Sequence, residues 1–286
     1  MTLAVEYLFL WFLFYSFCGW VYESILVSVQ ERRPVNRGFL NGPLCPIYGT
    51  GAVLGVVVLG EVDNPILLFV ISAVGACLLE YVTSWVMELL FHARWWDYSH
   101  FPFNLNGRIC LYGALIFGVG GVVIVDVVQP EVARVTAMIP LAAVHWLFVT
   151  LFALTVADTI VTVVGIIDFD KSLERFKDAI AKAARYGDVM REKVGDVVDG
   201  ATGMAGGVGG KVGESLYSGL RSGLRSGREM STEFMMRLRE TADSAFNRQQ
   251  RRMIASFPKL RASRNNEALQ QLREALNQLR RGDSRK

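Results

Sequence analysis

Five long apolar segments constrain the fold of this chain more than any other feature of its sequence. Each is apolar over about the 20 residues that an α-helix needs to cross a bilayer. Because lipid offers no partner to free backbone N–H and C=O groups, such segments fold as helices. We therefore predict an all-α polytopic membrane domain over residues 1–168. Its five transmembrane helices are expected at about 5–29, 43–62, 66–91, 109–128 and 138–166.

Charge divides the chain into two parts. Residues 1–168 contain 6 Arg and no Lys against 12 acidic residues, whereas residues 169–286 contain 24 basic and 15 acidic residues. An acidic apolar block followed by a basic polar one is typical of a membrane domain with a cytosolic tail. Arginines also gather in the loops after the first and third spans. The positive-inside rule then predicts a multi-pass plasma-membrane protein with its N-terminus outside and its C-terminal tail in the cytosol.

The basic tail, residues 169–286, contains little that predicts a stable domain. Residues 170–186 form an amphipathic helix pattern whose apolar face we expect on anionic headgroups. Glycine is dense over 195–227, which predicts a flexible linker because glycine destabilises helices. Four leucines near the C-terminus have heptad spacing and suggest a short coiled-coil seam; they are Leu269, Leu272, Leu276 and Leu279. The basic runs lack an aromatic-rich nucleic-acid motif, so a solvated face or headgroup contact is favoured over nucleic acid.

Two parts of the membrane domain have related sequences. Trp20-Val-x-Glu23 matches Trp85-Val-x-Glu88. In both copies an Asn-Gly pair follows the glutamate, and its asparagine, Asn41 or Asn106, lies 18 residues after that glutamate. Both copies run from one span into the next in the same direction, which predicts a parallel internal repeat of spans 1–2 and 3–4. Parallel repeats occur in transporters, where polar sites lie at the repeat interface.

The charged residues of the spans are the candidate site residues. Ionisable groups inside a membrane are costly and are usually paired or face water. We expect Glu23 and Glu88 to face each other near the cytosolic side, with Arg37, Arg94 and Arg108 as candidate partners, and Arg108 to fork onto Glu88. The asparagines of the repeat are expected to cap broken helix starts. The full candidate set is Glu23, Asn41, Glu80, Glu88, Asp97, Asn106, Arg108 and Asp158.

Two interpretations of these groups remain open. Thr155, Asp158, Thr159 and Thr162 form one polar stripe of the last span, which either bonds helices together or lines a pathway. The Glu–Arg pairs likewise either fix the packing of a pseudo-dimer or border a transport site. An intramembrane enzyme that uses Glu88, Asp97 and Arg108 is a further alternative.

No catalytic, metal or cofactor motif is recognised in the chain. The four cysteines form no C-x-x-C pair, and His and Glu lack metal-ligand spacing. Gly210-Lys211 lacks the glycine and the Ser/Thr of a phosphate-binding loop. We therefore expect no cofactor, no metal and no catalytic residue.

Two motifs resemble a known family. Phe39-Leu-Asn-Gly-Pro-Leu-Cys-Pro-Ile-Tyr-Gly49 and Phe103-Asn-Leu-Asn-Gly-Arg-Ile-Cys-Leu111 are similar to those of the CmpB-like ABC-transporter type IV permeases, over roughly residues 10–165. The resemblance implies a permease-like subunit that works with a separate ATPase on an unidentified substrate. The alternative is a non-transporting membrane scaffold or anchor whose basic tail binds partners or anionic lipid. A homodimer is also expected, because five spans make a small pathway.

Overall fold

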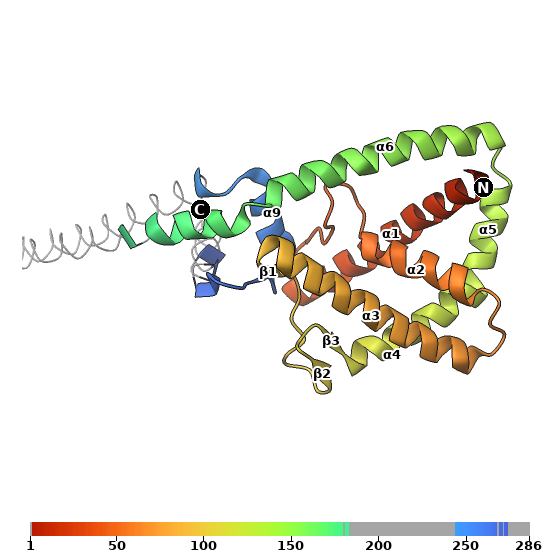
Figure 1. The fold of residues 1–286 in the computed structure, drawn as a ribbon, viewed down its shortest axis with the longest axis horizontal. Coiled ribbons are helices and arrows are strands. Elements are labelled where there is room, and N and C mark those ends of the chain that lie inside the picture. Colours follow the sequence, from red (N-terminus) through yellow and green to blue (C-terminus); the bar gives the residue numbers. More distant parts are fainter. Residues whose placement is uncertain (1, 180, 183–243, 268, 271, 274–286) are drawn as a thin grey trace, which may run out of the picture. The chain divides into compact units, whose positions relative to one another are not determined.

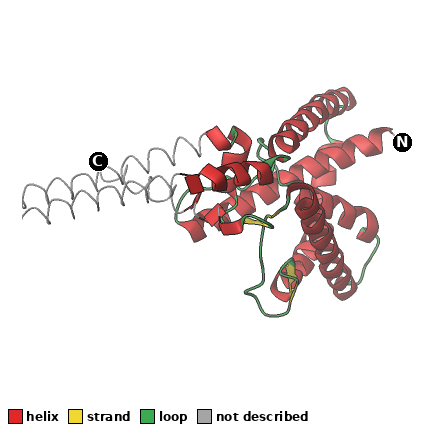
Figure 2. Ribbon diagram, turned by 60° about the vertical axis from the view of Figure 1, so that its left-hand side comes forward, coloured by secondary structure: helices red, strands yellow, loops and turns green. Residues whose placement is uncertain are grey.

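The computed structural model describes residues 2–179, 181–182, 244–267, 269–270 and 272–273. Helices account for nearly all of the regular structure in these residues, and the short strands are confined to the segments between helices (Figure 2). The prediction of an all-α polytopic membrane protein is confirmed. Figure 1 shows the helices of the membrane domain, which are α1 (Thr2–Glu31), α2 (Pro46–Leu59), α3 (Pro65–Phe91), α4 (Leu111–Val122), α5 (Gln129–Ala137) and α6 (Leu141–Ile166).

Among the described residues, four helices are long and apolar enough to cross a membrane: Leu3–Glu31, Pro65–Phe91, Leu111–Ala137 and Leu141–Ala179. The segment expected at 43–62 forms the shorter apolar helix α2, which has 14 residues. At 1.5 Å per residue α2 is about 21 Å long, which is less than the roughly 30 Å of a hydrocarbon core. The fifth complete span therefore stays a prediction.

The fourth span is longer than predicted. The chain stays helical from α4 through the π-helix η1 (Val123–Val128) into α5, so the predicted end of this span at about residue 128 is wrong. A π-turn is a wider helical turn. Pro130 follows directly at the start of α5, where its ring would clash with a preceding carbonyl in a regular α-helix. The wider turn before the proline explains how the helix continues through a sequence that normally breaks one.

Local sequence explains where the helices of the two related copies begin and end. Asn64 caps α3, since its side chain accepts hydrogen bonds from Ile66 N and Leu67 N. Cys45 and Cys110, which match in the repeat, are the extended residues before α2 and α4. The expected capping role of Asn41 and Asn106 is therefore wrong, because neither asparagine is the residue before a helix.

Helices α1 and α2 pack against each other, and so do α3 and α4. At both contacts a glycine allows close approach. A Cβ on Gly49 would overlap the carbonyl oxygen of Phe12, and one on Gly121 would overlap the side chain of Ser72. Small residues at helix contacts are the usual means of close packing in membranes.

Four short strands lie beyond the ends of these helices. Strands β2 (Asn104–Leu105) and β3 (Ile109–Cys110) form an antiparallel hairpin between α3 and α4. Strand β1 (Ala93–Arg94) pairs with β4 (Arg261–Ala262), which comes from the far end of the chain. Helix α9 (Arg248–Ser256) precedes β4, and Arg248–Arg264 belong to the same compact unit as the membrane helices up to Phe169.

The second compact unit contains the remaining described residues of the tail. Leu173 and Phe176 are buried in it, and the Phe176 ring lies 5.6 Å from the ring of Phe246. The expectation that these two side chains lie on lipid headgroups is therefore wrong. The glycine-rich stretch 195–227 falls outside the described residues, as do Leu276 and Leu279 of the coiled-coil seam.

Candidate functional site

After the loop that follows α3, the β2–β3 hairpin brings the chain back beside the end of α3. Asn106 and Gly107 both have positive φ, 53° and 65°, and Arg108 N donates to Leu105 O over 3.0 Å. Asn-Gly is the preferred pair for such a tight hairpin turn. The turn also needs glycine for space, because a Cβ on Gly107 would lie 2.7 Å from Asp97 Oδ1. It positions Arg108 beside the end of α3.

Glu88 is held by two guanidiniums. Arg108 Nη2 lies 2.7 Å from Glu88 Oε2, and Nε and Nη2 of Arg94 each lie 3.2 Å from the same oxygen. Arg108 Nη1 donates instead to Ser84 Oγ over 3.1 Å. Arg108 thus divides its donors between Glu88 and Ser84, and the two-donor contact with Glu88 comes from Arg94. Because Arg108 is buried and Glu88 is about three-quarters buried, solvent screens this cluster weakly.

Glu23 has a different set of partners. Arg37 Nε lies 3.5 Å from Glu23 Oε2, and Tyr48 Oη donates to Glu23 Oε1 over 2.6 Å. Burial lowers the pKa of Arg37, and the nearby Glu23 opposes that shift. Arg37 lies four residues before Asn41, whereas Arg108 lies two residues after Asn106. The two glutamates match in the repeat, but the arginines that pair with them do not.

Glu80 is more buried than Glu23 and Glu88, with 7% of its surface exposed. It accepts a hydrogen bond of 3.0 Å from Tyr98 Oη, in the loop after α3. Burial raises the pKa of Tyr98, and the adjacent Glu80 raises it further. Tyr98 therefore stays protonated and donates to Glu80.

Asp158 binds the first Asn-Gly turn. Its Oδ1 accepts from the backbone N and the Nδ2 of Asn41, at 3.0 and 2.7 Å, and its Oδ2 accepts from Gly42 N at 2.7 Å. Thr162 Oγ1 donates to the same carboxylate over 3.2 Å. This part of the polar stripe on α6 holds the loop between α1 and α2. At the second turn Asn106 Nδ2 donates instead to Tyr81 Oη over 3.0 Å.

Asp97 lies in the loop between α3 and the hairpin. Its Oδ1 accepts from Ser99 N over 3.0 Å, and its Oδ2 pairs with Arg261. Burial alone would raise the pKa of Asp97, but the hydrogen bonds from Arg261 and Ser99 hold that pKa below its ordinary value. Asp97 is thus a charged contact with the distal segment.

Residues 248–264 lie against these loops, a contact that was not predicted from the sequence. Gln249 Nε2 donates to Asn41 Oδ1 over 2.9 Å, and Ser263 Oγ donates to Glu88 Oε1 over 3.2 Å. Both contacts reach members of the candidate set. The sequence signal for this contact is a group of apolar residues within a largely polar part of the tail, at Phe246, Met253, Ile254, Phe257 and Leu260.

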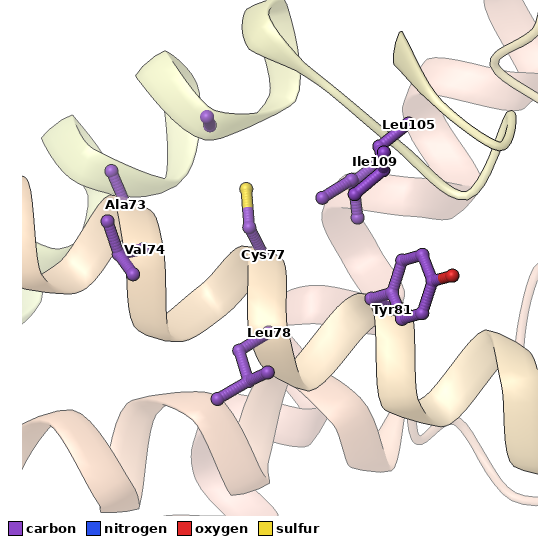
Figure 3. Close-up of a pocket in the computed structure, with 8 residues that line it drawn as sticks. Ala73, Val74, Cys77, Leu78, Tyr81, Leu105 and Ile109 are labelled. Atoms are coloured by element: carbon purple, nitrogen blue, oxygen red, sulfur yellow. The ribbon is translucent and has the colours of Figure 1, made fainter.

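An apolar hollow lies beside α3. Figure 3 shows Cys77, Leu78 and Tyr81 of α3 on one side and Leu105 and Ile109 of the hairpin on the other. Because its lining is almost wholly apolar, it suits a lipid chain better than a polar solute. Within the described part of the chain, no group of three or more His, Cys, Asp or Glu could hold a metal ion.

Comparisons with known proteins agree with the membrane architecture. A family model described as "Putative ABC-transporter type IV" matches residues 10–163, a range that contains all eight candidate site residues. The searches of curated proteins and of solved structures gave no match. Because the family model covers more than half of the chain, the protein belongs to this CmpB family of ABC-transporter type IV membrane proteins.

Proposed function

We propose that this protein is the membrane-spanning, permease-like subunit of a transporter whose ATPase is a separate chain. The family supports a transporter component. The sequence supports a separate ATPase. Gly210-Lys211 resembles part of a phosphate-binding loop, but the other residues of that loop are missing around it. The membrane subunit then supplies the solute pathway, and the ATPase supplies the energy.

The observation that carries this proposal is the group of charges at the loop-side ends of the helices. Glu88 with Arg94 and Arg108, and Glu23 with Arg37, place five charged side chains beside apolar helices. Ionisable groups inside a membrane are costly and commonly mark solute or ion pathways. A purely structural contact between helices needs no ion pairs, because apolar side chains of similar volume pack at least as well.

The orientation and the assembly are part of the same proposal. We place the N-terminus outside and the loops after α1 and α3 in the cytosol, on the basis of their arginines. The contact of Asn41 with Asp158 supports placing the loop after α1 and the C-terminal half of α6 on the same side of the membrane. A homodimer would provide a wider interface for a pathway than one copy of this small membrane domain.

The test is affinity purification of the tagged full-length protein from its native membranes. We expect an ATPase to co-purify in stoichiometric amount, and its ATP hydrolysis to change when the membrane subunit is reconstituted with it in vesicles. A protein that purifies intact without an ATPase, but with partners that depend on residues 169–286, would instead support the scaffold or anchor function.

A further inference from the structure

We propose that the loops after α1 and α3 form a binding site for an arginine-bearing helix followed by a short strand, and that residues 248–264 are its resident, displaceable ligand. The site is made by residues 37–41 and 92–97, which we call the loop face. The family model covers the loop face but ends at residue 163, so the ligand segment lies outside the family's common region. Figure 1 shows α9 next to the end of α6, and strand β4, which follows α9, pairs with β1.

The first anchor of the segment is Arg252 of α9. Its Nη1 donates to the carbonyls of Gly38 and Leu40, at 3.1 and 2.8 Å, and its Nη2 donates to that of Phe39 at 2.6 Å. Its Nε donates to Gln249 Oε1 over 3.1 Å, which fixes the plane of the guanidinium. A lysine ammonium has three donors on one atom and cannot span three successive carbonyls in this way. The loop face is therefore specific for arginine at this position.

The second anchor is the strand pairing. Ala262 lies opposite Ala93 and Arg261 opposite Arg94 in antiparallel register, and Ser263 N donates to His92 O over 2.9 Å. Addition of a strand to an exposed edge is a common mode of peptide recognition, in which backbone bonds give affinity and side chains give specificity. Here Arg261 supplies the specificity through its ion pair with Asp97.

The third anchor is apolar and lies between the other two. The Phe257 ring packs edge-on against the Trp95 ring with 4.9 Å between centroids. Arg37 Cζ lies 4.0 Å from the centroid of the Phe257 ring. Both Phe257 and Trp95 are buried, at 6% and 2% exposed. Phe257 also covers Arg37, and Ser263 occupies the second oxygen of Glu88. The docked segment thus closes the loop side of the charged groups, and its release would expose them.

The connectivity of the chain favours a ligand that can leave. Residues 248–264 belong to the compact unit of the membrane helices, but the chain on both sides of them, up to Asn247 and from Asn265, belongs to the second unit. A partner that binds the second unit therefore has a direct covalent connection to the docked segment. Several of the anchors are also partly exposed, such as Arg261 at 56%, so water can replace them.

A cross-linking experiment on the full-length protein in membranes tests this proposal. Residues directly opposite in antiparallel strands have Cα atoms about 4.5–5.5 Å apart, within the range of a disulfide. We expect the double variant Ala93→Cys/Ala262→Cys to form a disulfide under mild oxidation, while each single variant does not. Adding Arg252→Ala and Arg261→Ala should lower the cross-linked fraction at least fivefold. The matched control is Arg264→Ala, an exposed arginine of the same segment, which should leave the fraction unchanged.

Competition shows whether the docked segment is displaceable. An excess of a synthetic peptide of residues 246–264 should lower cross-linking of Ala93→Cys/Ala262→Cys, whereas the same peptide with alanine at 252 and 261 should not. This arm does not depend on the folding of the arginine variants. Failure of the double cysteine variant to cross-link, or equal cross-linking with and without the peptide, would overturn the proposal. Neither result depends on whether an ATPase is found.

Discussion

Arg108 Nη2 lies 2.7 Å from Glu88 Oε2, although twenty residues separate the two in sequence. The contact joins the end of α3 to the residues directly before α4, through a hairpin whose turn is made by Asn106 and Gly107. The same carboxylate receives Arg94 from the strand that follows α3. One glutamate thus connects helix α3, strand β1 and the start of α4.

Loss of either partner in this contact should destabilise the protein. Arg108→Ala leaves Glu88 with Arg94 and Ser263, and Glu88→Ala leaves two guanidiniums without their carboxylate. Removing one partner of a buried pair costs about 3–5 kcal/mol, and the partial exposure of Glu88 reduces this to roughly 2–3 kcal/mol. Thermal unfolding of the purified variants measures the effect. Arg108→Lys should also be destabilising, because an ammonium cannot reach both Glu88 and Ser84 in the same geometry. A wild-type melting temperature for Arg108→Ala would contradict this.

Asp158 should control the order of the loop between α1 and α2. Asp158→Ala removes the acceptor of three hydrogen bonds from Asn41 and Gly42, and a typical hydrogen bond contributes about 0.5–1.5 kcal/mol to stability. We expect faster amide hydrogen exchange over residues 38–44, measured by mass spectrometry. The control is Thr159→Val, on the same helix, because the Thr159 hydroxyl donates within that helix to Thr155 O. Equal exchange in the two variants would show that Asp158 does not hold the loop.

The contact between Asp97 and the distal segment predicts a pH dependence. The pKa of Asp97 is lower in the folded protein than its ordinary value of about 3.9. Its contribution to stability is therefore complete above the ordinary value and is lost as the pH falls through the folded one. We expect amide hydrogen exchange of residues 261–264, measured at each pH against an unstructured reference peptide, to become faster below about pH 4 when Asp97 is present. In Asp97→Asn this exchange should already be fast at neutral pH and should change less on acidification. Parallel acid profiles would contradict this role.

Topology can be read from cysteine labelling of exposed positions. In sealed cells, a membrane-impermeant maleimide should label Asp63→Cys and Glu131→Cys, which lie at the ends opposite the arginine-rich loops. Glu31→Cys and Lys259→Cys should react only after permeabilisation. Labelling of Lys259→Cys from outside would invert the proposed orientation.

The sequence predicted the features that depend on local composition. The third span, expected at 66–91, is α3 at Pro65–Phe91. An apolar run of this length folds as a helix in a membrane, and Asn64-Pro65 is a typical helix start. The tight turn at Asn106-Gly107 likewise follows from the sequence of those residues. The parallel repeat stays a prediction, although Cys45 and Cys110 precede their helices in both copies.

The features that could not be predicted depend on distant parts of the chain or on packing. The short α2 follows from Pro46 and the loop before it, and hydropathy alone does not resolve this end. Continuation of the fourth span past Pro130 depends on a π-turn, which has no simple sequence pattern. Docking of Arg252 on Gly38–Leu40 joins residues more than 200 positions apart, and its acceptors are backbone carbonyls that every residue has.

The most direct measurement compares ATP hydrolysis by the co-purified transporter for the wild type and for Glu88→Leu/Arg94→Met/Arg108→Met, which replaces all three charges of the contact by apolar side chains. If the charged contact borders the solute pathway, the triple variant should match the wild type in yield and in ATPase co-purification, but lose the change in hydrolysis that the membrane subunit causes. Recovery of yield and of the hydrolysis response together would show that the contact only fixes helix packing, and would contradict the proposed function of these residues.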